Sequence, residues 1–164
     1  LIGKKEYIDK MKKHPLARAF RVDKMTLAAM EATFFEYLDM EDAKRNIPVL
    51  RMITIPEEEL IQKAELIRNA IETATDHFAL NICSCKDQVG GGSAPTVKLS
   101  GVAVSVSSET LSAEKLERLL RKADTPVIVR VAHDEVLLSV RTIREEEIPA
   151  VASAFAFAAS HAEA

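Results

Sequence analysis

The stretch "HFALNICSCKDQVGGGSAPTVKLSGVAVSV" (residues 77–106) decides the fold of this chain. Hydrophobic Phe78, Leu80 and Ile82 alternate with smaller or polar residues, and the alternation returns in "GVAVSV" at 101–106. A period of two is typical of a β-strand with one buried face. Three consecutive glycines at 90–92 separate the two patterns, so the stretch predicts two strands joined by a loop.

The residues after this stretch complete a small sheet domain. Ser112 is a favourable N-cap for the helix "AEKLERLLRK" (113–122), and "PVIVRV" (126–131) and "EVLLSVRTI" (135–143) flank "AHD" as the two strands of a hairpin. A last helix is expected from about Glu145. The order β-β-α-β-β-α predicts the α/β class, as a small α+β domain with a short, mainly antiparallel sheet covered by helices. The helix residues expected in its core are Leu111, Leu116, Leu119, Leu120, Val151, Phe155 and Ala158.

The residues before the stretch are mostly helical in pattern. "LIGKK" is typical of the end of a strand, and "KEYIDKMKKH" (5–14) of a short helix closed by Pro15. A second helix is expected from the N-cap Asp23 to Met40, then a connection or short strand at "IPVLRMI", then a third helix with a capping box. The box pairs Thr54 with Glu57. The stripes expected in the core are Leu27, Met30, Phe34 and Leu38 in the second helix and Leu60, Ala64, Ile67 and Ile71 in the third.

Length and composition are those of a globular protein. The 164 residues are 48% hydrophobic and 29% charged, enough for one core or for a domain with an appendage. No apolar stretch is long enough for a membrane span and no signal-peptide pattern opens the chain, which favours a cytoplasmic protein without a membrane partner. The first residue is Leu1 rather than Met, so we expect a piece of a longer protein.

The cysteines do not predict a disulfide framework or a metal site. Cys83 and Cys85 are the only two, and their spacing places them on the same face of one expected strand. The histidines, at positions 14, 77, 133 and 161, lack ligand spacing to this pair. Buried, reduced thiols are the preferred interpretation.

Charge is distributed unevenly along the chain. Residues 1–24 contain eight Lys or Arg against three acidic residues, a net charge of +5, which leaves −8 for the rest of a chain whose net charge is −3. A basic N-terminal segment of this kind indicates that this part of the protein binds an anion, either phosphate or nucleic acid. A solvated lysine face on a surface helix is the alternative, and it is preferred for Lys4 to Lys13 taken alone.

The glycine run does not fit a P-loop. No Gly-Lys-Ser/Thr follows Gly90–Ser93, and the next element is a loop leading to a strand instead of a helix N-terminus. A flexible surface loop that joins two strands, with no binding role, fits the composition of this segment about as well as a phosphate-binding loop does.

Arg18 and Arg21 are the second candidate site. They are three residues apart in "HPLARAFRVDK", so in a helical or turn-like segment they share a face and form a two-pronged clamp for an oxyanion. The planar guanidinium is suited to this task because it binds two oxygens at once. A pair of surface arginines bound to Asp or Glu is the open alternative.

Four motifs in order resemble a known family. "LIGKKEYIDKMKKHPLARAFRVDKMTLAAMEATFFEYLD", "IPVLRMIT", "QVGGGSAP" and "TPVIVRVAHDEVLLSVRTI" are similar to the C-terminal third of bacterial selenocysteine synthase, the L-seryl-tRNA(Sec) selenium transferase. The resemblance implies a pyridoxal phosphate (PLP) enzyme of fold type I. It implies that residues 1–23 end the large cofactor-binding domain, that 24–45 form a bridging helix, and that 46–164 form the small C-terminal domain.

The resemblance places the cofactor lysine outside this chain. In the family the Schiff-base lysine lies just upstream of the motif that begins here, and neither Lys4 nor Lys5 matches it. We therefore expect no catalytic residue in this chain and no activity from the chain alone.

The resemblance also assigns binding roles. Arg18 and Arg21 match arginines that help to bind the selenophosphate anion, and Gly91, Gly92 and Ser93 match an element that approaches the aminoacyl part of the substrate. "SAPTVKLS" departs from the acidic, Leu-Pro-rich stretch that is usual there.

The implied reaction of the whole enzyme is a β-replacement. Seryl-tRNA(Sec) loses water and gains selenium from selenophosphate, with PLP carrying the chemistry and a homo-oligomer as the expected assembly. Two alternatives are a D-glucosaminate-6-phosphate ammonia lyase-like PLP enzyme and a non-catalytic RNA-binding or oligomerisation module.

Overall fold

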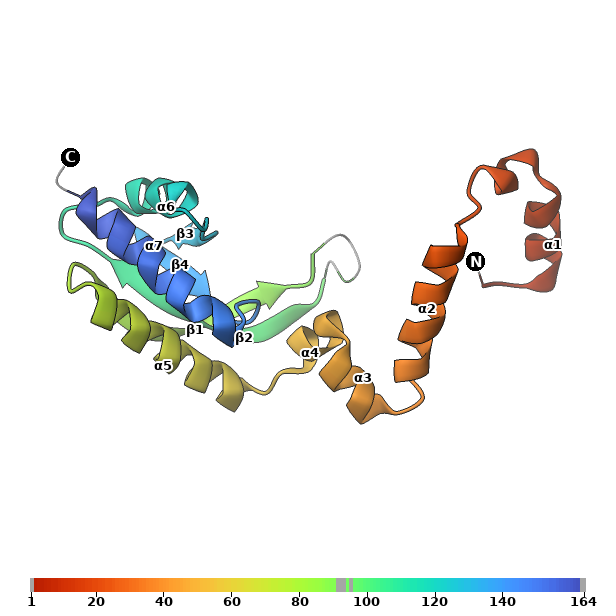
Figure 1. The fold of residues 1–164 in the computed structure, drawn as a ribbon, viewed down its shortest axis with the longest axis horizontal. Coiled ribbons are helices and arrows are strands. Elements are labelled where there is room, and N and C mark those ends of the chain that lie inside the picture. Colours follow the sequence, from red (N-terminus) through yellow and green to blue (C-terminus); the bar gives the residue numbers. More distant parts are fainter. Residues whose placement is uncertain (1, 91–93, 95, 163–164) are drawn as a thin grey trace. The chain divides into compact units, whose positions relative to one another are not determined.

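The computed structural model describes residues 2–90, 94 and 96–162, which form two compact units (Figure 1). The first unit is Leu1–Arg51 and the second is Met52–Ala164. No helix in the described part of the chain is long and apolar enough to cross a membrane. The domain limits implied by the resemblance, at 23 and 45, stay predictions. The single helix expected from Asp23 to Met40 is wrong, because one helix ends at Glu36 and the next begins at Met40.

The first unit consists of helices with local caps. It contains α1 (Lys5–Lys13), the 3-10 helix η1 (Pro15–Arg18), α2 (Lys24–Glu36), α3 (Met40–Asn46) and most of α4 (Pro48–Thr54). The carboxylate of Asp23 accepts a hydrogen bond from the Thr26 amide (2.8 Å), as the predicted N-cap requires, and Asp39 caps α3 in the same way. Residues 2–4 are not in a strand, so the expected strand end at "LIGKK" is wrong for them.

The segment "IPVLRMI" is helical, which corrects the expected connection or short strand. Pro48 is the first residue of α4, where its missing N–H is no loss, and the Arg51 amide donates to the Ile47 carbonyl (2.9 Å). The predicted capping box is also wrong, because Thr54 ends α4 and the N-cap of α5 (Glu57–Ala74) is Pro56 without a side-chain hydrogen bond.

The apolar stripe of α2 is exposed, although its spacing predicted a core. Leu27, Met30 and Phe34 of α2, and Leu38 in the turn after it, keep about half or more of their surface, and α2 has no buried residue. These side chains instead line a shallow apolar groove with Phe35. Helical spacing identifies side chains that share a face, but it does not supply the surface that covers them.

The second unit contains the predicted β-β-α-β-β-α order after α5. Its elements are β1 (Ala79–Gln88), β2 (Lys98–Ser107), α6 (Ala113–Lys122), β3 (Arg130–Ala132), β4 (Glu135–Ser139), η2 (Glu145–Glu147) and α7 (Ile148–Ser160). The four strands form one antiparallel sheet in the order β1-β2-β4-β3. β1 and β2 pair along their whole length, from Ala79 opposite Ser107 to Gln88 opposite Lys98.

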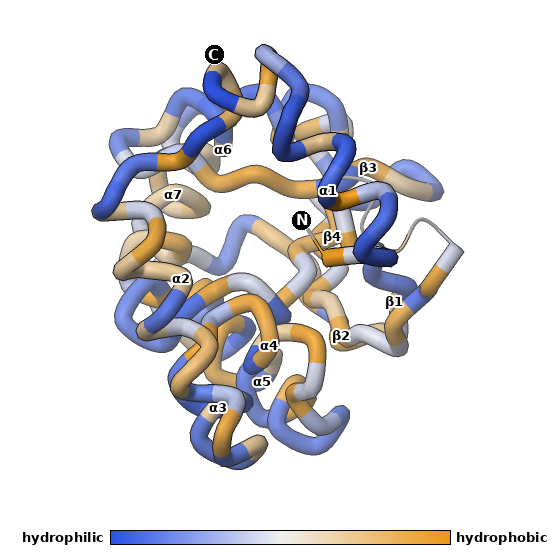
Figure 2. The backbone as a smooth tube through the Cα atoms, turned by 90° about the vertical axis from the view of Figure 1, so that its right-hand side faces the viewer, coloured by the Kyte–Doolittle hydropathy of each residue, from blue (hydrophilic) through white to orange (hydrophobic). Residues whose placement is uncertain are grey.

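The hairpin between β3 and β4 turns at His133 and Asp134. Both have positive φ (53° and 61°), the backbone of a type I′ turn, which matches the twist of paired strands. β3 is shorter than predicted because the Val127 amide donates to the Leu120 carbonyl at the end of α6 (3.0 Å). The hydrophobic segment between α6 and β3, orange in Figure 2, therefore leaves the sheet.

One face of the sheet forms the core with α5, α6 and α7. Alternate valines of β2 at 102, 104 and 106 lie in one buried cluster with the predicted α5 stripe and with Phe155 of α7. The interpretation of 60, 64, 67 and 71 as a core stripe is confirmed, since all four are fully buried. Leu119 is only partly buried, while the other helix residues expected in this core are buried as predicted.

Candidate functional site

Arg18 and Arg21 lie on a short turn that is built by local hydrogen bonds. Pro15 starts η1, the Nδ1 atom of His14 accepts from the Leu16 amide (3.2 Å), and the Arg21 amide donates to the Arg18 carbonyl (3.4 Å). Both arginine side chains are exposed. The segment is thus turn-like, as the clamp interpretation requires, and the clamp itself stays a prediction.

The electrostatic surroundings leave the two guanidinium groups without an acidic partner in the described residues. The carboxylate of Asp23 is held by the Thr26 amide, and this hydrogen bond lowers the pKa of Asp23. Asp9 pairs with Lys5 (2.7 Å) in the preceding helix. Asp9 and Asp23 thus have other partners, and no ion pair of Arg18 or Arg21 is present among the described residues.

Three of the predicted site residues, Gly91, Gly92 and Ser93, lie outside the described residues. Gly90 is exposed in a turn, and no atom lies within 4 Å of the position that a Cβ would take. Nothing in the described structure therefore demands glycine at position 90.

A buried ion pair lies where β1 ends, and sequence reasoning missed it. Asp87 and Arg141 are each only 8% exposed, and Arg141 Nε donates to Asp87 Oδ2 at 2.8 Å. Arg141 also donates to the Met52 carbonyl (2.7 Å) and to the Ser100 carbonyl. Ser139 Oγ donates to Asp87 Oδ1 (2.9 Å). All the polar contacts that a buried charge pair needs are thus present.

Gly101 makes room for this pair. A Cβ at position 101 would lie 2.3 Å from Asp87 Oδ2 and 3.1 Å from Cys85 Sγ. Gly101 stands opposite Cys85 in the register of β1 and β2. The steric need for glycine in this hairpin is therefore in the strand, beside the ion pair.

Arg130 and Cys85 complete the polar cluster. Arg130 donates to the Lys86 carbonyl (3.1 Å), with its other terminal nitrogen 3.8 Å from Asp87 Oδ1. Burial and the negative charge of Asp87 raise the pKa of Cys85, which donates to Asp87 Oδ1 (3.6 Å). Cys83 and Cys85 are free and half-buried, less buried than predicted. A thiol held protonated is a poor nucleophile.

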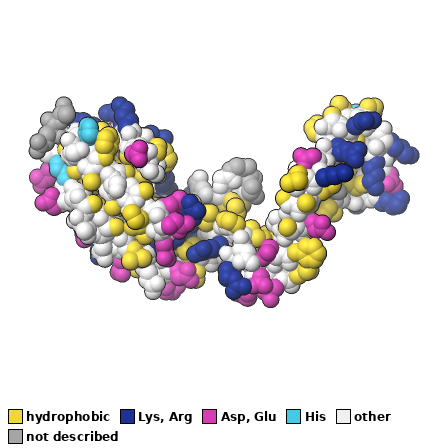
Figure 3. All heavy atoms as spheres, viewed as in Figure 1, with side chains coloured by type: hydrophobic (Ala, Val, Ile, Leu, Met, Phe, Trp, Pro, Cys, Tyr) yellow, Lys and Arg dark blue, Asp and Glu magenta, His cyan; other side chains and the backbone are white. Residues whose placement is uncertain are grey.

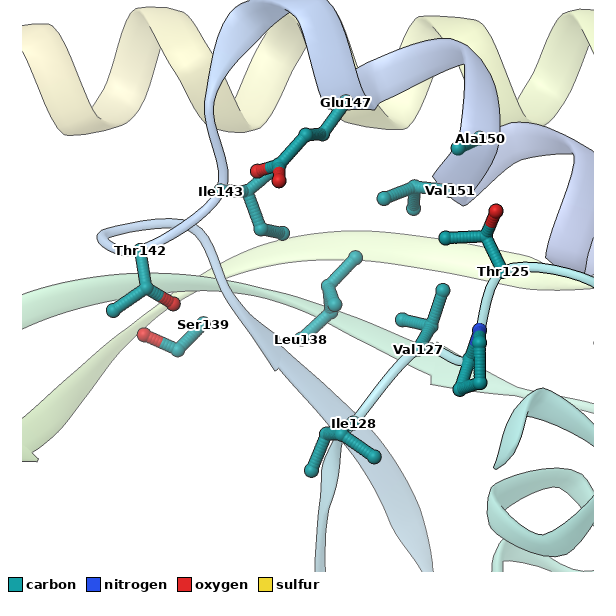
Figure 4. Close-up of a pocket in the computed structure, with 11 residues that line it drawn as sticks. Thr125, Val127, Ile128, Leu138, Ser139, Thr142, Ile143, Glu147, Ala150 and Val151 are labelled. Atoms are coloured by element: carbon teal, nitrogen blue, oxygen red, sulfur yellow. The ribbon is translucent and has the colours of Figure 1, made fainter.

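A cavity of about 240 Å³ lies beside the start of α7 (Figure 4). Its apolar wall includes Val127 and Leu138, and Glu147 extends toward it from η2, just before α7. The Glu147 carboxylate accepts from the Arg144 side chain (3.0 Å), which lowers its pKa, so its charge is already compensated. The cavity can hold a small apolar group but has no uncompensated charge for catalysis.

The described residues of the cavity beside α7 do not include the lysine that a pyridoxal cofactor binds, and the described chain shows no metal-ligand cluster. Such a cofactor needs a lysine amine in a pocket, and no lysine lines the cavity beside α7. Lys4 and Lys5 are exposed, and Lys5 is paired with Asp9. No group of three or more His, Cys, Asp or Glu side chains in the described part of the chain is placed to hold a metal ion.

Comparison with known proteins gives one consistent result. A family model described as L-seryl-tRNA selenium transferase matches residues 1–144. The L-seryl-tRNA(Sec) selenium transferase of Alkaliphilus oremlandii (strain OhILAs) is 42% identical over 155 residues, which are 94% of this chain and 33% of that protein. The protein of the same name from Clostridium botulinum (strain Hall) is 41% identical over 155 residues, 94% of this chain and 34% of that protein. The chain spans about a third of the length of these relatives.

Proposed function

The chain belongs to the L-seryl-tRNA selenium transferase family, and on that premise we propose that it is part of an enzyme that converts seryl-tRNA(Sec) to selenocysteinyl-tRNA(Sec). The observation that carries the proposal is the match of the family model to residues 1–144, together with relatives that bear this activity in their names. Both relatives compared above are named as selenium transferases, so we prefer this function to that of an ammonia lyase. A cytoplasmic homo-oligomer of fold type I is part of the same proposal.

Arg18 and Arg21 are the proposed contacts to selenophosphate. They lie on a hydrogen-bonded turn, are exposed, and have no acidic partner among the described residues. Two guanidinium groups offer several N–H donors to a phosphate-like oxyanion, and charge-assisted hydrogen bonds of this kind are strong. Gly91, Gly92 and Ser93 remain the proposed contacts to the aminoacyl group, by resemblance alone.

The cofactor in this proposal is held by the rest of the enzyme. Pyridoxal phosphate, when bound, would supply the electron sink for replacing the serine hydroxyl with selenium. Because the family resemblance places the Schiff-base lysine outside this chain, the proposed contribution of this chain is to bind and orient the selenium donor and the aminoacyl end. The chain alone is therefore proposed to be inactive.

A chimeric enzyme tests the proposed function. The corresponding third of the Alkaliphilus oremlandii protein is replaced by this chain, and selenium transfer from selenophosphate to seryl-tRNA(Sec) is measured. We expect activity from the chimera and none from the 164-residue chain alone. A folded, cofactor-loaded chimera that releases ammonia from a phosphorylated amino sugar acid but transfers no selenium would instead support the ammonia lyase alternative.

A further inference from the structure

Phe20 stands between the two arginines with its ring in solvent. At 80% exposure it is the most exposed of the six phenylalanines. Its amide donates to the Leu16 carbonyl (3.2 Å), and the Ala19 amide donates to the same carbonyl (2.9 Å). The backbone that carries this ring is thus held by hydrogen bonds.

The ring lies in the most basic part of the sequence. α1 carries Lys10, Lys12 and Lys13 in its last turn, and Lys and Arg side chains gather around α1 in Figure 3. Within the described part of the chain, Lys5 is the one cation of residues 2–24 that forms an ion pair, and its partner is Asp9. Most of the cations in residues 2–24 therefore have no ion-pair partner among the described residues.

The exposed ring together with the unpaired cations discriminates among three possible surroundings of this surface: solvent, a protein surface and a strand of nucleic acid. A solvated lysine face explains the cations but leaves a large aromatic ring in water. A protein surface that covered the ring, whether of a partner or of another part of the same enzyme, would also remove several neighbouring cations from water, which is costly unless each finds a carboxylate. A single strand of nucleic acid satisfies both features, since its phosphates neutralise lysines and its bases stack on aromatic rings.

We propose that Phe20 is a stacking platform for an unpaired nucleotide, and that the lysines at the end of α1 contact the phosphates of the same strand. Stacking on the ring requires a free base face, which a nucleotide inside a duplex does not offer. The identity of the strand as the acceptor end of a tRNA rests on the proposed function. A nucleotide at Phe20 would lie on the same turn as Arg18 and Arg21, and so would bring the aminoacyl end close to the proposed selenium donor.

Single-stranded RNA that contains the fluorescent base 2-aminopurine tests the proposal on the 164-residue chain at low salt. We expect binding to quench the fluorescence, as stacking does. Phe20→Ala should lower the affinity about 5- to 150-fold and remove the quenching, whereas Phe20→Trp should keep both. Phe35→Ala is the matched control, because Phe35 is 63% exposed and lies in α2, whose sequence contains no arginine, and it should bind as the parent chain does.

A second variant tests the phosphate contacts. Replacing Lys10, Lys12 and Lys13 together by Ala should weaken binding and lower the salt slope by about 0.7 for each lost contact, while saturating RNA still quenches fully. Unchanged affinity of Phe20→Ala, an equal loss in Phe35→Ala, or equal binding of duplex RNA would overturn the proposal. Phe20-dependent self-association in sedimentation without RNA binding would show a protein partner instead.

The proposed function and the stacking platform at Phe20 can be refuted independently of each other. An inactive chimera with intact Phe20-dependent RNA binding would refute selenium transfer and leave the stacking platform in place. An active chimera in which Phe20→Ala changes neither RNA binding by the chain nor the KM for seryl-tRNA would refute the platform alone.

Discussion

Arg141 Nε lies 2.8 Å from Asp87 Oδ2. This nearly buried ion pair joins the end of β1 to Arg141, the second residue after the end of β4. The same guanidinium binds the carbonyls of Met52 and Ser100, and thereby ties the backbone at Met52, the first residue of the second unit, and β2 to the pair. A surface ion pair contributes little to stability, but a buried pair whose partner is removed leaves an uncompensated charge. This relationship is the basis of the first prediction.

Asp87→Ala and Arg141→Ala should each lower the free energy of unfolding by about 3–5 kcal/mol, because each leaves the other charge buried and unpaired. Urea denaturation followed by circular dichroism measures the change. Arg121→Ala is the control, since Arg121 is exposed and pairs with Glu117 on the surface, and its effect should stay below about 1 kcal/mol. Equal small effects in all three variants would show that the buried pair does not stabilise the fold.

Gly101→Ala should destabilise the second unit, whereas Gly90→Ala should not. The new Cβ at 101 would lie 2.3 Å from an Asp87 oxygen that Arg141 holds in place, while the one at 90 meets no atom within 4 Å. Overpacking of this kind costs about 1–3 kcal/mol. The difference between the melting temperatures of the two variants is the measurement, and a similar melting temperature for both would contradict the steric argument.

Cys85 should react slowly with iodoacetamide and should need a higher pH than an ordinary thiol. Burial and the Asp87 carboxylate raise its pKa, so less thiolate is present at a given pH, and thiolate is the reactive form. Labelling at several pH values, followed by mass spectrometry of the peptide, measures the rate. The same chain in urea is the control, and its Cys85 should react faster and at lower pH. Equal profiles in the folded and unfolded chain would refute the shift.

Arg18→Ala and Arg21→Ala, made in the chimeric enzyme, should each weaken the use of selenophosphate about 10- to 150-fold, because each removes a charge-assisted bond of about 1.5–3 kcal/mol. Arg→Lys should restore part of the loss, since lysine keeps the charge without the two-oxygen fork. Kinetics at varied selenophosphate measure this, with Arg45→Ala as the control because Arg45 pairs with Asp42. Normal selenophosphate kinetics together with a weaker, less salt-dependent tRNA affinity would make the pair a nucleic-acid contact.

Much of the second unit could be predicted from the sequence because its signals are local. The alternation at 78–82 and 101–106, the Ser112 cap and the stripe from Leu60 to Ile71 each depend on neighbours within a few residues, and the structure contains all of them. Local periodicity predicts less well where tertiary contacts decide the secondary structure or the burial of a segment. "IPVLRMI" became a helix, and the stripe of α2 lacks a covering surface in the described chain.

By itself the sequence determined the family, the order of the elements that follow α5 and the basic region around Arg18 and Arg21, because these depend on residue identity and short-range spacing. Only the tertiary structure brought Asp87 to Arg141, which are 54 residues apart in the chain, and showed that Gly101 makes room for them. No periodic pattern links such distant residues, since their pairing depends on how β2 lies between β1 and β4 and on which polar groups the packed sheet removes from water.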